Sequence, residues 1–301
     1  MGVPEATSRD GAEASGEPSS RVRSLALAPV LLVGAPRSGT TWLQRTLLSM
    51  PECCGGQESH ALCTIAKVVG DFERKAAMER PHGLAAHLTR DGLLDQMRRL
   101  WVAAMRSSIE ATPHAIRLLE KTPDHAVHLD LADELLPESK AIHLVRDPRD
   151  VVASLIAASR RSWGAGWAPS TVEGATRRWI ECVDAAEASG RRLGPTRFLR
   201  VRYDDLLRTP ESALAKVLGF LDLPPDRSGD RLEFLMTAAE NGGAEIPIFG
   251  ELSGRAFVEP EGFVGGSRPL GGLARRRVTR LVGSRLAELG FEPDTRREPA
   301  S

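Results

Sequence analysis

The sequence has little that would fix its partners by composition alone. Its 40 lysine and arginine residues are balanced by 40 aspartate and glutamate residues, so no overall charge draws the 301-residue chain onto nucleic acid or an anionic membrane. Aromatic residues make up 5% of the chain, which is too few for a base-stacking surface. The longest apolar run, residues 25–35, is far shorter than the roughly 20 residues of a membrane-spanning helix. An anionic ligand would therefore have to bind at a local site.

The four cysteines are too few and too irregularly placed for a disulfide framework or a paired zinc site. We expect reduced thiols and a reducing compartment, although the neighbouring Cys53 and Cys54 could instead form a redox pair. The histidines show no ligand spacing with carboxylates or cysteines, so no metal is predicted. Residues 1–23 lack the apolar segment of a signal peptide and are predicted to be a disordered tail. Together these features predict a cytoplasmic protein.

Short apolar runs alternate with segments of helical periodicity, as expected when strands are buried on both faces of a parallel sheet. This pattern predicts an α/β protein with a P-loop-like three-layer fold, in which helices flank a central parallel sheet. The predicted strands are 29–33, 115–119, 141–145 and 198–201. The predicted helices are 40–50, 84–110, 124–135 with Asp124 as cap, one from 148 onward, 172–188, 212–221 and 275–289.

One domain is expected over residues 24–295, followed by a flexible C-terminus at 296–301. Glycine and proline crowd residues 241–272, which predicts a lid or long loop there.

The sequence Gly-Ala-Pro-Arg-Ser-Gly-Thr-Thr-Trp-Leu lies between the first predicted strand and the first predicted helix. In this arrangement, free backbone N–H groups and the helix dipole can hold an anion. Gly39 permits close approach of a ligand to the backbone, and Arg37 adds a cation. Hydroxyl groups come from Ser38, Thr40 and Thr41. The alternative, an ordinary capped turn, does not require an arginine and three hydroxyls beside its glycine.

The same loop matches a Walker A motif except that Thr40 replaces the lysine. Because that lysine contacts the β- and γ-phosphates, its absence argues against a kinase or ATPase. The cation of this loop is Arg37, which could hold the 5′-phosphate of a nucleotide whose transferable group needs no metal.

A second anion-binding element begins at the carboxyl end of the strand predicted at 141–145, where open α/β sheets bind their ligands. Arg146 leaves this strand, and Ser154 lies about two helical turns further on. The two side chains could hold one phosphate together. The alternative is a surface network of salt bridges among Arg146, Asp147, Arg149 and Asp150.

Three segments, 36–43, 145–154 and 201–206, resemble in sequence and order the signatures of sulfotransferases that use 3′-phosphoadenosine 5′-phosphosulfate (PAPS). The resemblance covers residues 29–223 and is strongest to a bacterial branch similar to tyrosylprotein and carbohydrate sulfotransferases. It implies that Arg146 and Ser154 hold the 3′-phosphate. It further implies that the donor is bound by Arg37, Ser38, Gly39, Thr40, Thr41, Trp42 and Tyr203. The family's C-terminal clamp has no clear match, and Arg268 is its only weak candidate.

The resemblance also implies which residues carry out sulfuryl transfer, namely Glu58, Lys121 and Arg37. Lys121 matches a lysine that neutralises charge on the departing nucleotide. Glu58, which follows the first helix and so returns to the cleft, matches a catalytic glutamate that takes the acceptor's proton. Glu58 could instead be a solvated loop carboxylate. His60 and His125 are the alternative bases.

The sequence therefore predicts a metal-independent sulfotransferase that moves a sulfuryl group from PAPS to a hydroxyl or amine. The acceptor, whether a small molecule, carbohydrate or peptide, is expected to be bound by residues 58–70, 163–169 and 241–272. Two alternatives are a P-loop-type kinase or NTPase and a non-catalytic nucleotide-binding module.

Overall fold

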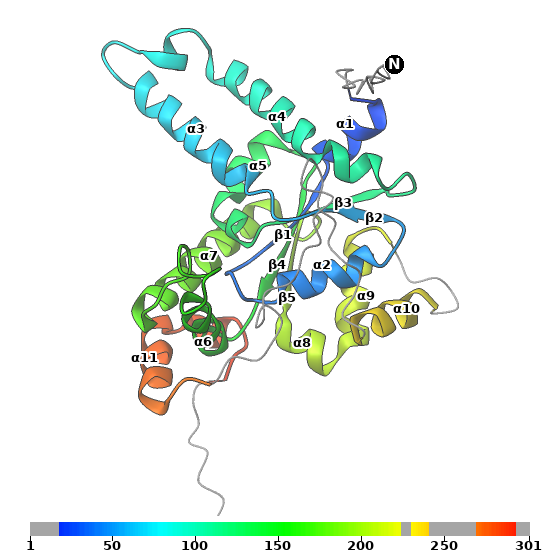
Figure 1. Cartoon of the computed structure of the whole chain (residues 1–301), viewed down its shortest axis with the longest axis vertical. Helices are drawn as coiled ribbons and strands as arrows, with labels where there is room; N and C mark the ends of the chain where they lie inside the picture. Colours follow the sequence, from blue (N-terminus) through cyan, green and yellow to red (C-terminus); the bar gives the residue numbers. More distant parts are fainter. Residues whose placement is uncertain (1–17, 224–229, 241–268, 293–301) are drawn as a thin grey trace, which may run out of the picture.

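The computed structural model describes residues 18–223, 230–240 and 269–292. In this part of the chain, five parallel strands form one sheet in the order β2-β3-β1-β4-β5 (Figure 1). The strands are β1 (Val30–Val33), β2 (Cys53–Gly55), β3 (Arg117–Lys121), β4 (Lys140–Val145) and β5 (Phe198–Arg202). The parallel sheet expected from the sequence is confirmed, and the four predicted strands lie within two residues of their expected positions. The edge strand β2 was not predicted.

Helices precede, connect and follow these strands. Their bounds are α1 (Ser20–Leu27), α2 (Thr40–Leu48), α3 (Ala61–Ala76), the 3₁₀ helix η1 (Gly83–Ala86), α4 (Arg90–Glu110), the 3₁₀ helix η2 (Pro123–His128), α5 (Leu129–Leu135), α6 (Pro148–Ser159), α7 (Val172–Leu193), α8 (Tyr203–Arg208), α9 (Pro210–Phe220), α10 (Asp230–Glu240), α11 (Gly272–Val282) and α12 (Arg285–Glu288).

The sheet separates two apolar cores, because successive side chains of a strand point to opposite faces. Leu31 and Val33 of β1 pack in a core shared with α1, α3, α4, α6, α7 and α11. Val30 and Leu32 pack in a second core with α2, α9 and α10. The helix–sheet–helix layering predicted from the sequence is therefore confirmed.

The adjacent Cys53 and Cys54 of β2 lie in different cores. Both are buried, and neither is in a disulfide. Their side chains leave the strand on opposite faces, so the interpretation of this pair as a redox couple is wrong, and each is a small core residue.

Helix α1 begins at Ser20, inside the segment 1–23 that was predicted to be a tail, so that boundary is wrong. Composition suggested disorder, but Val22 and Ala26 of this helix are buried. The indole N–H of Trp101, in α4, donates a hydrogen bond to the carbonyl oxygen of Ala26 at 2.7 Å. The helix is therefore part of the packed domain.

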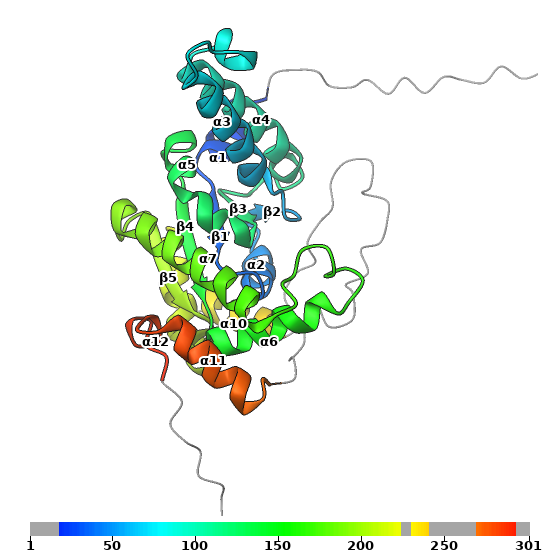
Figure 2. The same ribbon diagram turned by 90° about the vertical axis from the view of Figure 1, so that its left-hand side faces the viewer.

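Helices α3 and α4, with η1 between them, form a hairpin that extends beyond the end of the sheet (Figures 1 and 2). Residues 58–70 were predicted to be irregular and to line the acceptor pocket, and over residues 61–70 the irregular structure is wrong. Leu62, Ile65, Val69 and Phe72 recur at helical spacing and are buried, so the segment forms an amphipathic helix.

Two further helix boundaries differ from the prediction. Asp124 does not cap α5, because η2 intervenes and Asp124 pairs instead with Arg178 of α7 at 2.6 Å. The single helix predicted at 275–289 is interrupted at Gly283, whose φ of 63° is a left-handed conformation that ends α11. Residues 241–268 lie outside the described residues, and they include most of the predicted lid as well as Arg268.

Over the described ranges, no helix combines the length and apolar character needed to cross a bilayer. The same residues contain no group of three or more histidine, cysteine or carboxylate side chains arranged to hold a metal ion.

Candidate active site

The predicted site residues gather at the carboxyl edge of the sheet, where β1, β3 and β4 end. Strand β1 lies between β3 and β4. The chain runs from β1 to β2 on one side of this position and from β4 to β5 on the other. This is the switch point at which open α/β sheets bind ligands. Arg37, Lys121 and Arg146 follow or end these three strands. The topology therefore brings together cations that are far apart in the sequence.

The loop between β1 and α2 has the backbone of an anion-binding turn. Gly39 precedes α2 with a φ of 97°, and no side chain caps the helix. Arg37 also has a positive φ, 78°. Ser38 is completely buried, yet its hydroxyl oxygen has no hydrogen-bond partner among the described residues. A buried hydroxyl beside an uncapped helix N-terminus fits an anion that would satisfy both.

The structure joins the two predicted phosphate-binding elements directly. The Nε atom of Arg37 donates to the hydroxyl of Ser154 in α6 at 3.0 Å. The Nη1 atom of Arg146 donates to the carbonyl oxygen of Arg37 at 3.4 Å. Burial and the charge of Arg146 lower the pKa of the Arg37 guanidinium, against a smaller opposing effect of Glu58. Two arginines held this close favour a ligand with more than one negative charge.

Aromatic rings support the second arginine. The guanidinium carbon of Arg146 lies 4.6 Å from the ring centre of Tyr203, which contacts Trp42 edge-on at 6.5 Å between centroids. The indole of Trp179 donates to the carbonyl oxygen of Arg146 at 3.1 Å. The predicted donor-binding residues Arg146, Tyr203 and Trp42 therefore form one contiguous group.

The alternative of a surface salt-bridge network after β4 is only partly realised. Asp147 accepts a hydrogen bond from the backbone N–H of Arg149, which caps α6, and also pairs with the Arg149 side chain. Arg149 is 5% exposed, so this pair is internal rather than on the surface. It fixes the turn from which Arg146 projects toward Arg37.

The two residues predicted to carry out the transfer are in contact. The Nζ atom of Lys121 donates to Oε1 of Glu58 at 2.5 Å. The Lys121 side chain is 3% exposed and that of Glu58 is 29% exposed, so the carboxylate is the member of the pair that a second substrate can reach. The other carboxylate oxygen lies 3.5 Å from Nε2 of His60. Gln44 of α2 holds the start of the loop between β2 and α3, which carries Glu58, by donating to the carbonyl oxygen of Gly56 at 2.9 Å.

The structure separates the two alternative bases. His60 is exposed beside Glu58. His125 is completely buried, with Nδ1 facing Glu120 at 2.8 Å and Nε2 accepting from the backbone N–H of Leu62 at 3.2 Å. Both ring nitrogens of His125 are directed at protein groups, so this histidine does not face the cleft as a base would.

Sequence reasoning missed two groups of residues. One is the buried carboxylate of Glu120, which binds Ser59 from 61 positions away, a pairing that leaves no local pattern. The other is Trp163, whose ring centre lies 5.6 Å from the guanidinium carbon of Arg37. Trp163 was assigned to the acceptor side, and only the fold shows that it contacts the anion-binding loop.

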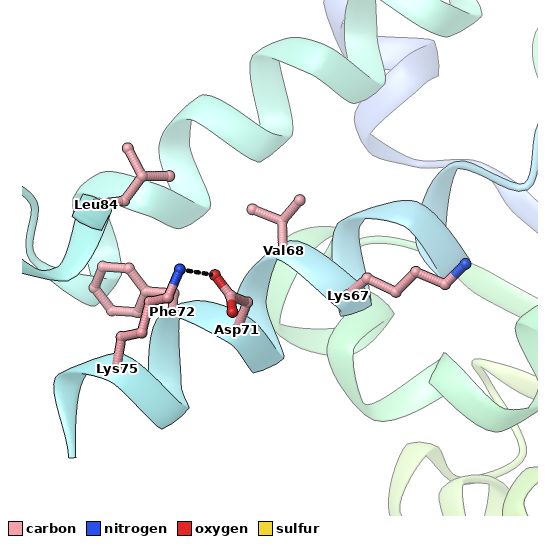
Figure 3. Close-up of a pocket in the computed structure, with 6 residues that line it drawn as sticks. All are labelled: Lys67, Val68, Asp71, Phe72, Lys75 and Leu84. Atoms are coloured by element: carbon pink, nitrogen blue, oxygen red, sulfur yellow. Dashed lines mark ion pairs between the residues drawn. The ribbon is translucent and has the colours of Figure 1, made fainter. Parts of the chain in front are cut away.

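A separate cavity of about 320 Å³ lies on the α3–α4 hairpin (Figure 3). Lys67, Val68, Asp71, Phe72, Lys75 and Leu84 line it. Lys75 pairs with Asp71 at 2.8 Å, so its charge is neutralised. Residues 58–70, expected to form one pocket wall, are thus divided between the active-site loop and this hairpin.

The fold and the site define a class of protein: an α/β protein whose turn between a strand and a helix is suited to a multiply charged anion. The family model described as "Sulfotransferase family" matches residues 29–227, and the chain belongs to this family.

Curated relatives share about a quarter of their aligned residues with this chain. It is 27% identical to a protein-tyrosine sulfotransferase of Drosophila melanogaster over 195 residues, which cover 65% of this chain and 38% of that protein. It is 25% identical to protein-tyrosine sulfotransferase A of Caenorhabditis elegans, covering 65% of this chain and 50% of that one. It is 25% identical to protein-tyrosine sulfotransferase 1 of Danio rerio, covering 88% and 72%. The chain thus spans half or less of the length of the first two relatives.

Solved structures share the fold. Sulfotransferase STF9 from Mycobacterium avium superposes with a TM-score of 0.53 at 16% identity, covering 92% of this chain and 80% of that one. Mouse sulfotransferase SULT7A1, solved with PAP, gives a TM-score of 0.52 at 14% identity, covering 91% and 90%. At these identities the likeness shows a common architecture.

Proposed function

We propose that this protein transfers a sulfuryl group from PAPS to a hydroxyl or amine of an acceptor. The observation that carries the proposal is the convergence of Arg37, Arg146 and the buried Ser38 hydroxyl opposite the Glu58–Lys121 pair. The residues assigned to anion binding and the residues assigned to the transfer then lie at the same edge of the sheet. This is the arrangement that in-line group transfer requires.

The residues present fit a bisphosphorylated donor. Ser38 Oγ and Arg146 Nε are buried polar atoms without a hydrogen-bond partner in the described part of the chain, and a bound anion would satisfy both. We assign the 5′ side of the donor to Arg37, Ser38, Gly39, Thr40 and Thr41, with Trp42 and Tyr203 beside it. We assign the 3′-phosphate to Arg146 and Ser154.

When bound, PAPS would supply the sulfuryl group and a nucleotide leaving group. Lys121 neutralises negative charge near the reacting centre from a buried position, where an electrostatic interaction is stronger than in water. Glu58 accepts the proton of the acceptor through its partly exposed carboxylate. The ion pair with Lys121 holds that carboxylate beside the same reacting centre.

The acceptor side is assigned to the turn after α6. Trp163 lies over Arg37, and its ring centre is 6.1 Å from that of Trp167. Trp167 is 48% exposed, which leaves one face of the pair open. The sequence similarity to protein-tyrosine sulfotransferases supports an acceptor with a ring that can stack on this pair, such as a phenol, a peptide tyrosine or a sugar.

Donor binding is tested first, with adenosine 3′,5′-bisphosphate (PAP) in calorimetric titrations. The variants Arg37→Ala and Arg146→Ala each remove charge-assisted hydrogen bonds, so PAP binding should weaken about 10- to 100-fold. Arg74→Ala, a change at an exposed arginine of α3, is the matched control and should bind PAP normally. Unchanged affinity in both site variants would contradict the assigned donor site.

Transfer is tested with radiolabelled PAPS and a panel of phenols, peptides, sugars and lipids. Glu58→Gln should reduce transfer about 100-fold or more while leaving PAP affinity within about twofold. PAP binding without transfer to any acceptor, together with no effect of Glu58→Gln, would favour the non-catalytic module. ATP turnover that requires magnesium would favour the kinase alternative.

Two further expectations belong to this proposal. Transfer should proceed in the presence of EDTA, because two arginines and a lysine provide the positive charge that a metal would otherwise supply. The cytoplasmic location expected from the sequence stays a prediction.

A further inference from the structure

The carboxylate of Glu120 is the most heavily bonded buried acid near the active site. Glu120 is 3% exposed and lies directly before Lys121 at the end of β3. A carboxylate buried this deeply is costly unless every oxygen is satisfied. Its partners come from the loop that carries Glu58 and from the turn that follows Lys121.

One oxygen of Glu120 binds the base-carrying loop. Oε1 accepts from the hydroxyl of Ser59 at 2.7 Å and from the backbone N–H of Ser59 at 3.4 Å. It also accepts from the hydroxyl of Thr122 at 2.7 Å. That same hydroxyl oxygen accepts from the backbone N–H of His60 at 3.3 Å. These hydrogen bonds fix the backbone around Ser59 relative to the backbone around Glu120.

The other oxygen of Glu120 binds the start of α3 through a histidine. Oε2 lies 2.8 Å from Nδ1 of His125, whose Nε2 accepts from the N–H of Leu62 in the first turn of α3. The Ser59 hydroxyl also accepts from the N–H of Ala61 at 3.1 Å. Two of the N–H groups that a helix leaves without partners at its N-terminus are therefore satisfied by this network.

The pKa of Glu120 agrees with a carboxylate whose ionised form is stabilised by its surroundings. Burial alone would raise it, but the facing His125 and the hydroxyl groups of Ser59 and Thr122 lower it to about 2. The network is therefore assembled around an ionised Glu120 across the working pH range of an enzyme.

We propose that Glu120 is a positioning residue, which through Ser59, Thr122 and His125 holds the Glu58 carboxylate on Lys121. Glu58 precedes Ser59 and Lys121 follows Glu120, so the network sets the position of both backbones that carry the reacting pair. This inference rests on the proposed function, since it gives Glu120 a role in the same transfer. It also reassigns His125, an alternative base in the sequence, to a supporting role.

The test uses Ser59→Ala, which removes two hydrogen bonds but leaves Glu120 paired with Thr122 and His125. Its kcat should fall about 10- to 100-fold because the base is displaced, while the Kd for PAP stays within about twofold. Ser59→Thr keeps the hydroxyl and should restore most of the lost kcat. A general loss of stability would instead lower the melting temperature and leave this split between kcat and Kd absent.

A matched control is available in the same molecule. His143 of β4 is completely buried and faces Glu187 of α7 at 3.0 Å, a histidine–carboxylate pair that contains no residue assigned to the site. Glu187→Gln should lower stability but leave kcat within about twofold at temperatures where the variant is folded. If Ser59→Ala and Glu187→Gln affect kcat equally, the positioning role of Glu120 is wrong.

A structural readout separates this inference from the proposed function. In crystal structures, the Glu58–Lys121 contact should be intact in the wild type and in Ser59→Thr and displaced in Ser59→Ala. If the contact is unchanged in Ser59→Ala, the positioning role is overturned even where the wild type transfers sulfuryl groups. If the contact is displaced but the wild type transfers to no acceptor, the positioning of the pair stands and the proposed reaction fails.

Discussion

At the scale of single residues, Gly39 is a position where a methyl group would disturb the candidate donor site directly. Its φ of 97° disfavours other residues, and a Cβ built there would lie 2.5 Å from the Tyr203 ring. Gly39→Ala should therefore lower the free energy of unfolding by about 1–3 kcal/mol. It should also weaken PAP binding about tenfold or more, because displacing Tyr203 removes the ring on which Arg146 rests.

Gly70→Ala is the matched control for that change. Gly70 lies inside α3, and a Cβ there would meet no atom within 4 Å. Because alanine is the better helix former, this variant should be as stable as the wild type or more stable by up to about 1 kcal/mol. Urea denaturation and PAP titration measure both variants. Wild-type PAP affinity in Gly39→Ala would show that the loop does not hold the donor.

Cys63 is predicted to be the most reactive of the three thiols with shifted pKa values. Burial alone would raise its pKa, but the neighbouring imidazoles of His125 and His128 lower it to about 6. Burial raises the pKa of Cys54 to about 11 and that of Cys182 to about 12. Since the thiolate is the nucleophile, alkylation of Cys63 by iodoacetamide should reach half of its maximal rate near pH 6.

Peptide mass spectrometry after timed alkylation checks this order of reactivity. Cys54 and Cys182 should stay unmodified in the folded protein at pH 8. His128→Gln removes one of these two imidazoles and should move the midpoint for Cys63 to higher pH. A midpoint near the ordinary thiol value, about 8.5, in the wild type would contradict the effect assigned to the two histidines.

At the scale of elements, the parts readable from the sequence are those with local signatures. Strands β1 and β4 are continuous apolar runs, and each is followed by a helix start marked by glycine or proline. Strand β2 has only three residues and borders glycine, so it carries no periodicity. The Glu120 network depends on pairings between residues 61 and 63 positions apart, which no local pattern predicts. Local sequence thus located the two turns to which phosphate binding is assigned but not the contacts that support Glu58.

The start of α6 illustrates how an element terminus can depend on a buried ion pair. Asp147 accepts from the backbone N–H of Arg149 at 2.8 Å and is also the partner of that nearly buried guanidinium. Asp147→Ala should therefore lower the free energy of unfolding by about 3–5 kcal/mol, because it leaves the Arg149 charge inside the protein without its main partner. Thermal and urea denaturation provide the measurement.

A simple helix cap gives the comparison. Thr89 caps α4 by accepting from the N–H of Gly92 at 3.1 Å, in an exposed position with no ion pair to the same group. Thr89→Ala should cost about 1 kcal/mol. Equal losses in the two variants would mean that the Asp147–Arg149 pair adds nothing beyond capping.

At the scale of the whole molecule, a chain with no net charge concentrates cations at one edge of its sheet. Several arginines elsewhere on the surface face carboxylates, as Arg90 faces both Glu73 and Glu134. At the active site, Arg37 faces Arg146, and the fold holds them together at the ends of two neighbouring strands. The local concentration of positive charge at this edge therefore arises from topology and not from composition.

The N-terminal helix contributes to the stability of the whole domain from a position outside the assigned site. The guanidinium of Arg21 donates to the carbonyl oxygens of Ile109, Thr112 and Ala115 at 3.2, 2.8 and 2.9 Å. These carbonyls lie where α4 ends and the chain turns into β3. Arg21→Ala should lower the free energy of unfolding by about 1.5–3 kcal/mol and the melting temperature by about 3–6 °C.

The neighbouring Arg23→Ala is the control, because Arg23 is exposed on the same helix and its loss should change stability by no more than about 0.5 kcal/mol. Both variants should bind PAP with wild-type affinity at temperatures where they are folded. Lys121 lies at the far end of β3 from the carbonyls that Arg21 binds. Removing the Arg21 side chain should therefore affect the active site only when the protein unfolds. Weaker PAP binding by folded Arg21→Ala would instead mean that α1 sets the geometry of the sheet edge as well as its stability.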